Sequence, residues 1–193
     1  FIGVFLQDDQ VELIPFTVAT PGGVVLRTFG YGGGVNAAGD PIAPIGFDPM
    51  LTLFDGAGWQ LVQNDDAGCG SVGDPGSGLC LDARIDASLP AGSYVLALTQ
   101  WGNFSIGPTV ADGFLQAGTD NYTGPDGFWD LMGAQRTGLW AVDITTPDAQ
   151  PVPEPATVLL VGGGLAALGH TRSRAATRKR ASPDRSQQPA IHV

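Results

Sequence analysis

The feature that most constrains the fold is a series of short segments in which apolar and polar residues alternate, separated by turns rich in Gly, Pro and Asp. A repeat of two residues places every second side chain on one face of a β-strand, so each segment indicates a half-buried strand. No segment before residue 150 has the period of an amphipathic helix. The expected strands cover residues 1–6, 11–19, 24–31, 47–55, 59–64, 83–89, 93–100 and 139–145.

About eight short antiparallel strands with Gly- and Pro-rich turns predict an all-β domain over residues 1–145, an antiparallel β-sandwich of jelly-roll type. The "GAG" at 56–58 predicts a hairpin between the strands at 47–55 and 59–64. Residues 101–138 are too long for an ordinary connection. We expect this segment to cap one end of the sandwich.

Charge excludes one class of partner. Residues 1–150 contain 17 acidic residues and only three basic ones, all arginines, whereas residues 151–193 contain an excess of basic residues. A body with so few cations cannot neutralise phosphates, so we expect no nucleic-acid binding. The acidity has two readings that stay open: general solubility, or the binding of a cation.

The two cysteines, Cys69 and Cys80, lie in one Gly-, Ser- and Pro-rich loop. Neither histidine lies in the body, so a zinc site lacks ligands and a local disulfide is the favoured interpretation, with two free thiols as the alternative. A disulfide indicates an oxidising compartment. The chain opens directly on a strand-like segment, which we interpret as a fragment or a mature form without its export signal.

A calcium site is the sharpest chemical hypothesis. Calcium takes six to eight oxygen ligands, and an antiparallel hairpin returns Asp48 and Asp65 to the same end of the sandwich. The proposed ligands are Asp48, Asp65, Asp66 and Asp82. The alternative is that "NDDAG" forms an ordinary Asx-rich turn and that Asp48 caps a strand.

Carbohydrate binding is a second hypothesis, because Trp101, Tyr122 and Trp129, with Trp59, could present aromatic faces beside polar loops. The alternative is that these rings pack the long segment onto the sandwich. A secreted hydrolase is disfavoured, since a body without histidine has no Ser-His or Cys-His pair.

The C-terminal part differs from the body in composition and in the sign of its charge. Residues 146–155 form a Pro-rich linker, residues 156–171 form a short apolar helix of transmembrane type, and residues 172–193 form a basic tail. The apolar run is short for a bilayer core. The basic residues would keep its C-terminal side in the cytoplasm.

The order "VPEP", apolar run, Arg-rich cluster over Val152–Arg180 resembles the PEP-CTERM sorting signal of exported Gram-negative proteins. The resemblance implies that an exosortase in the inner membrane recognises Pro153, Glu154 and Pro155. It also implies transient anchoring in that membrane, delivery to the cell surface or the medium, and an association with extracellular polysaccharide and biofilm. The chain departs from the family by continuing beyond its basic cluster.

The body resembles a family of secreted PEP-CTERM proteins without assigned activity, in "GVFLQDDQVELIPFTVATPGGVVLRT", "FDPMLTLFDGAGWQLVQNDDAG" and "LDARIDASLPAGSYVLALTQWGNF". It is also similar to the bacterial pre-peptidase C-terminal domain, a β-sandwich appended to secreted proteases, mainly in Asp48-Pro49, Asp55, Asn64-Asp65-Asp66 and the "PAGSY" turn. That similarity implies an accessory module rather than a catalyst. We therefore expect an exported, non-enzymatic protein with a structural or adhesive role.

Overall fold

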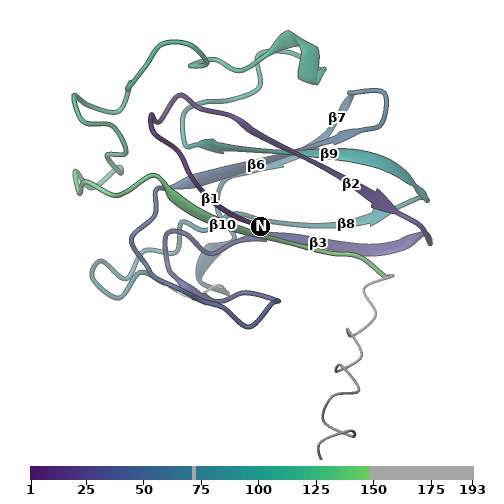
Figure 1. Ribbon diagram of the computed structural model, residues 1–193, viewed down its shortest axis with the longest axis horizontal. Coiled ribbons are helices and arrows are strands. Elements are labelled where there is room, and N and C mark those ends of the chain that lie inside the picture. The colour runs from purple at the N-terminus through teal and green to yellow at the C-terminus, as the bar shows by residue number, and fades with distance from the viewer. Residues whose placement is uncertain (71–72, 148–193) are drawn as a thin grey trace, which may run out of the picture. The chain divides into compact units, whose positions relative to one another are not determined.

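The computed structural model describes residues 1–70 and 73–147. Figure 1 shows two facing layers of strands in this part of the chain. The eight main strands are β1 (Ile2–Val4), β2 (Glu12–Val18), β3 (Gly22–Thr28), β6 (Pro49–Asp55), β7 (Gln60–Asn64), β8 (Arg84–Leu89), β9 (Gly92–Gln100) and β10 (Leu139–Thr145). Two short strands, β4 (Gly34–Val35) and β5 (Pro41–Ile42), pair with each other, and two 3-10 turns cover Gly68–Gly70 and Val110–Asp112.

The strands are arranged as one long hairpin rolled upon itself. The first main strand pairs with the last (β1 with β10), the second with the second-last (β2 with β9), the third with the third-last (β3 with β8), and the middle two with each other (β6 with β7), all antiparallel. Pairing of β10 with β3 and of β6 with β9 completes two sheets, ordered β1-β10-β3-β8 and β2-β9-β6-β7. This is a jelly-roll sandwich and confirms the predicted fold class.

The core lies between the two sheets and follows the predicted alternation. Leu96 and Leu98 of β9 face Leu26 of β3 and Val142 of β10 across one continuous cluster of buried side chains. Ile85 and Leu89 also point inward, as their spacing in β8 predicts. The period-2 pattern therefore gives the inward face of these strands correctly.

Two local expectations differ from the structure. The strand expected at 24–31 ends at Thr28, because the backbone N–H groups of Tyr31 and Gly32 turn away to donate to the buried carboxylate of Asp82, at 3.2 and 2.7 Å. The glycine-rich loop that follows forms the small hairpin of β4 and β5, which the sequence analysis did not anticipate.

The long segment at 101–138 does more than cap one end. Val110 and Phe114 pack on the outer face of the second sheet, where Phe114 meets Phe54 edge-on with ring centroids 6.4 Å apart. The later part does close the end of the core, since Phe128 packs on Phe47 at 5.6 Å. In Figure 1 this teal-to-green segment arches over the sheet that contains β6 and β9.

A turn between β1 and β2 holds this segment in place through its carboxylates. Asp8, which is fully buried, accepts hydrogen bonds from the backbone N–H of Tyr122 (2.9 Å), Thr123 (3.0 Å) and Phe128 (3.1 Å), and from the Thr123 hydroxyl. The neighbouring Asp9 accepts from the N–H groups of 118 and 120. The two aspartates thus replace the backbone partners that a sheet would supply to an irregular segment.

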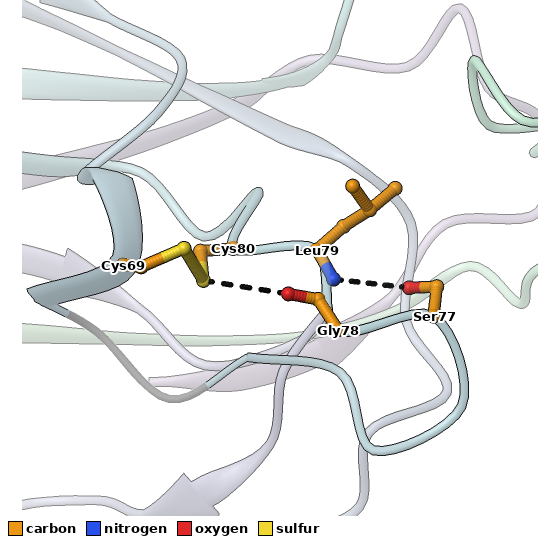
Figure 2. Close-up of a disulfide and its surroundings, with 5 residues drawn as sticks. All are labelled: Cys69, Ser77, Gly78, Leu79 and Cys80. Carbon is orange, nitrogen blue, oxygen red and sulfur yellow. Dashed lines mark hydrogen bonds between the residues drawn. A yellow bond between two sulfur atoms is a disulfide. The ribbon is translucent and has the colours of Figure 1, made fainter.

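The disulfide predicted between Cys69 and Cys80 is present, with the two Cα atoms 5.1 Å apart. Figure 2 shows it beside Gly78, while Ser77 accepts a hydrogen bond from the N–H of Leu79 at 3.3 Å. The same loop carries Asp74, whose carboxylate pairs with the largely buried guanidinium of Arg136 at 3.4 Å.

Arg136 joins three loops. Its guanidinium also donates to the carbonyl oxygens of Tyr31 (2.8 Å), Pro44 (3.1 Å) and Gly46 (3.0 Å), and it lies 4.1 Å from the centre of the Tyr31 ring. One cation therefore connects the disulfide loop, the glycine-rich loop and the end of the long segment.

Replacing Asp8 with Ala should lower the free energy of unfolding by about 3 kcal/mol or more, because four donors, one buried and three partly buried, lose a fully buried acceptor. Residues 116–128 should also become sensitive to protease. Denaturant unfolding and mapped proteolysis measure the two effects. Asp126→Ala, an exposed aspartate of the same segment, is the matched control. Equal stability of the two variants would contradict the assigned role of Asp8.

Candidate functional site: an acidic, aromatic pocket

A pocket of about 350 Å³ lies where the end of the sandwich meets the long segment. It combines residues that the sequence analysis assigned to two separate hypotheses, since Asp48 comes from the calcium set and the three rings come from the carbohydrate set. The lining residues are Asp48, Gln100, Trp101, Tyr122, Thr123, Trp129, Asp130 and Leu131.

The pairing of β6 with β9 sets the floor of this pocket. Asp48 stands directly before β6 and Trp101 directly after β9, and the register pairs Pro49 with Gln100. The N–H of Trp101 donates to the carbonyl of Asp48 at 2.8 Å, which extends the ladder by one step. Two residues 53 positions apart in the sequence are thereby fixed side by side.

The aromatic rings are anchored from behind. The hydroxyl of Tyr122 donates to the carbonyl of Trp101 at 2.7 Å, and the N–H of Trp129 donates to the Thr123 hydroxyl at 2.9 Å. Because all three rings are only partly buried, they both pack the long segment and leave surface in the pocket. The rings thus pack the long segment onto the sandwich, as one interpretation expected. Carbohydrate binding by the surface that they leave in the pocket stays a prediction.

Asp48 is electrostatically the most unusual group of the pocket. Its side chain is 2% exposed, and its Oδ1 has no hydrogen-bond partner in the part of the chain that the structure describes. Burial, followed by the repulsion of nearby carboxylates, raises the pKa of Asp48 to about 8. In decreasing order of effect these are Asp66, Asp65, Asp130 and Asp82. Burial also raises the pKa of Tyr122, and the carboxylates of Asp8, Asp48 and Asp9 act in the same direction.

The four proposed calcium ligands share one electrostatic neighbourhood but differ in their partners. The oxygens of Asp82 are engaged by Thr28, Tyr31 and Gly32. Asp65 accepts the N–H of Asp66 at 3.0 Å, one position on rather than the two of an Asx turn. Within residues 1–70 and 73–147, no three carboxylate, thiol or imidazole groups are arranged to hold a metal ion. Calcium binding by Asp48, Asp65, Asp66 and Asp82 stays a prediction.

Four residues of the pocket lining were missed by the sequence analysis, namely Gln100, Thr123, Asp130 and Leu131. Gln100 stands two positions after Leu98 in β9, so the alternation of the strand places its amide on the core-facing side. An amide on a core-facing position could therefore have been recognised from the sequence. Asp130 carried no such signal, because it is one aspartate among many in an irregular segment; its oxygens accept from Tyr31, Met132 and Ala134. Trp59 lies outside the pocket and is 54% exposed.

The described residues therefore define a disulfide-containing jelly-roll sandwich with an acidic pocket walled by aromatic rings. The C-terminal part provides the comparison with known proteins, since residues 151–174 match the model of a family described as the PEP-CTERM protein-sorting motif. The match includes Pro153, Glu154 and Pro155 and begins one residue before the predicted segment. This signal marks exported proteins of Gram-negative bacteria that are anchored in the membrane before sorting, and it implies an exosortase as processing partner.

The body has no such match. No curated protein and no solved structure matches the chain. The similarity of the body to pre-peptidase C-terminal domains thus rests on sequence pattern alone. The sorting motif, and the apolar helix expected at 156–171, lie outside the described residues. Within them, no helix combines the length and the hydropathy that a membrane crossing requires.

Titration of Asp48 should make the protein less stable as the pH rises. A carboxyl whose folded pKa is raised from 3.8 to about 8 binds its proton more tightly in the folded state, so stability is lost between these two values. Each pKa unit corresponds to about 1.4 kcal/mol. Asp48→Asn should match the wild type near pH 4 and exceed its unfolding free energy by several kcal/mol at pH 8.

Denaturant unfolding at a series of pH values measures this difference. Asp86→Asn, which removes a carboxylate paired with Arg84 on the surface, is the control and should leave the slope nearly unchanged. Parallel curves for the wild type and Asp48→Asn would show that Asp48 is not the titrating group.

Proposed function

We propose that this chain is an exported, non-enzymatic protein that an exosortase delivers to the cell surface or the extracellular matrix, where it is associated with polysaccharide. The observation that carries the proposal is the sorting motif at residues 151–174. The body is then the functional product, and the C-terminal part is the signal that directs its sorting.

Two features of the body support this proposal. The Cys69–Cys80 disulfide suits a protein that works outside the reducing cytosol. The absence of histidine from the sequence of residues 1–150 removes the usual base for a serine or cysteine nucleophile. A secreted hydrolase would have to use carboxylates alone, and no pair of them is favoured.

Delivery follows from the order of the C-terminal segments. The apolar segment at 156–171 holds the chain in the inner membrane, and the basic residues after it stay on the cytoplasmic side. The Pro-rich linker at 146–155 then presents Pro153, Glu154 and Pro155 to the sorting enzyme on the opposite side.

Carbohydrate binding is the second candidate function, and the pocket at Asp48 favours it. Aromatic rings pack against the apolar face of a sugar ring, while a few polar groups beside them fix its hydroxyl groups. Trp101, Tyr122 and Trp129 supply the rings, and Gln100 and Asp130 supply polar groups in the same pocket.

Sorting predicts that Glu154 is required for processing. In the source cells the wild-type protein should be recovered with a mass that ends near Pro153–Pro155, whereas Glu154→Gln should accumulate in the membrane with its C-terminal part attached. Glu12→Gln changes the only other glutamate of the chain and should be processed normally. Intact-mass measurement on cells and medium separates these outcomes. A wild-type protein that keeps Val193 in every fraction would overturn the sorting proposal.

Carbohydrate binding predicts that the pocket rings are needed for retention on polysaccharide. The full chain in mild detergent should be retained on immobilised exopolysaccharide from the source cells. Trp101→Ala and Trp129→Ala should each lose retention by about tenfold or more in dissociation constant, the usual cost of losing a stacked ring at a binding site. Trp59→Ala removes a tryptophan outside the pocket and should bind as the wild type does. Equal loss in all three variants would argue against the pocket.

A further inference from the structure

Two acceptors in the pocket lack partners, and this is the observation that specifies a ligand. Within the part of the chain that the structure describes, Oδ1 of Asp48 and Oε1 of Gln100 are buried without a hydrogen bond, and the two residues are 2% and 1% exposed. A buried acceptor without a donor destabilises the folded protein, because it has lost its water without gaining a partner. Because both side chains line the same pocket, one ligand that carries several donors could satisfy them together.

The negative charge of the pocket favours a ligand whose hydrogen-bond donors are positively charged. Its lining contains two aspartates and no Lys, Arg or His. Asp65 and Asp66 add to the negative field at Asp48. Arg136 is already engaged by Asp74 and by three backbone carbonyls. A carboxylate or sulfate would be repelled here, whereas a positively charged donor would gain from every neighbouring carboxylate.

The aromatic walls narrow the choice further. A bare metal ion gains little from the aromatic rings that line the pocket. An aliphatic ring packs against such rings, and an ammonium group is attracted to their faces. The volume of about 350 Å³ lies near the lower end for ligand pockets, which suits one ring of a chain rather than an extended segment.

We propose that the pocket at Asp48 and Gln100 binds a hexosamine unit whose amine is free and protonated, with the ammonium directed at the two unpartnered acceptors and the sugar ring packed against Trp101 and Trp129. This inference rests on the carbohydrate-binding candidate and adds the chemical class of the sugar. It requires that the protein selects a cationic polymer over a neutral or anionic one of the same ring size.

The test compares oligomers that share a six-membered sugar ring and differ in charge and in the substituent that carries it. Tetramers of glucosamine, N-acetylglucosamine and glucuronic acid are titrated calorimetrically into the full chain in mild detergent. The glucosamine tetramer should bind on the order of thirtyfold more tightly than the acetylated one, as expected when a charge pairs with a buried carboxylate. The glucuronic acid tetramer should not bind.

Asp48→Asn keeps the shape of the side chain but cannot ionise when an ammonium group binds beside it, so it should fold and should abolish the preference for glucosamine. Asp86→Asn removes one surface carboxylate outside the pocket lining and should keep the preference. A lysine tetramer, which carries ammonium groups without a sugar ring, should bind more weakly than the glucosamine tetramer.

Each other outcome overturns the inference in a different way. Equal binding of the neutral and cationic sugars, sensitive to Trp101→Ala, would leave carbohydrate binding intact and remove the role of the amine. Equal binding of the lysine tetramer would reduce the site to general charge attraction. Binding of calcium chloride that is lost in Asp48→Asn, with no response to any sugar, would replace the sugar by a metal ion. No binding of any probe would overturn both the amine and the carbohydrate site.

Discussion

The carboxylate of Asp8 is the interaction on which the pocket and the long segment above it depend. A segment of almost forty residues without a strand has backbone donors that no sheet can satisfy, and Asp8 accepts from three of them as well as from the Thr123 hydroxyl. The residues that it holds are neighbours of the rings that wall the pocket. The turn between β1 and β2 therefore forms an internal support for the site.

Much of the fold could be predicted because it rests on local patterns. The alternation in β8, β9 and β10 gave their inward faces, and the short Gly-containing turn gave the hairpin of β6 and β7. The disulfide followed from two cysteines in one loop. These features depend on residues close together in the sequence, where the period of side chains and the chemistry of turns leave few alternatives.

The parts that could not be predicted depend on contacts between distant residues. Burial of Asp8 and Asp82 is determined by donors that lie about 110 and 50 positions away, and nothing in their own neighbourhood distinguishes them from surface aspartates. For the same reason the sequence placed Asp48 and Trp101 in different hypotheses, although the pairing of β6 with β9 puts them side by side. Among these pocket residues, only Gln100 could be recognised from its local sequence, because its amide falls on the apolar face of β9.

The rolled hairpin also has a mechanical consequence. Among the described strands, β10 is the last one before the sorting segment in the sequence. It lies between β1 and β3 and is hydrogen-bonded to both. A pull transmitted through the chain beyond Thr145 would load two ladders at once, whereas an edge strand such as β7 or β8 could be peeled away one bond at a time. While the C-terminal part is still attached, such a pull would thus act on a strand that is held on both sides rather than on an edge strand.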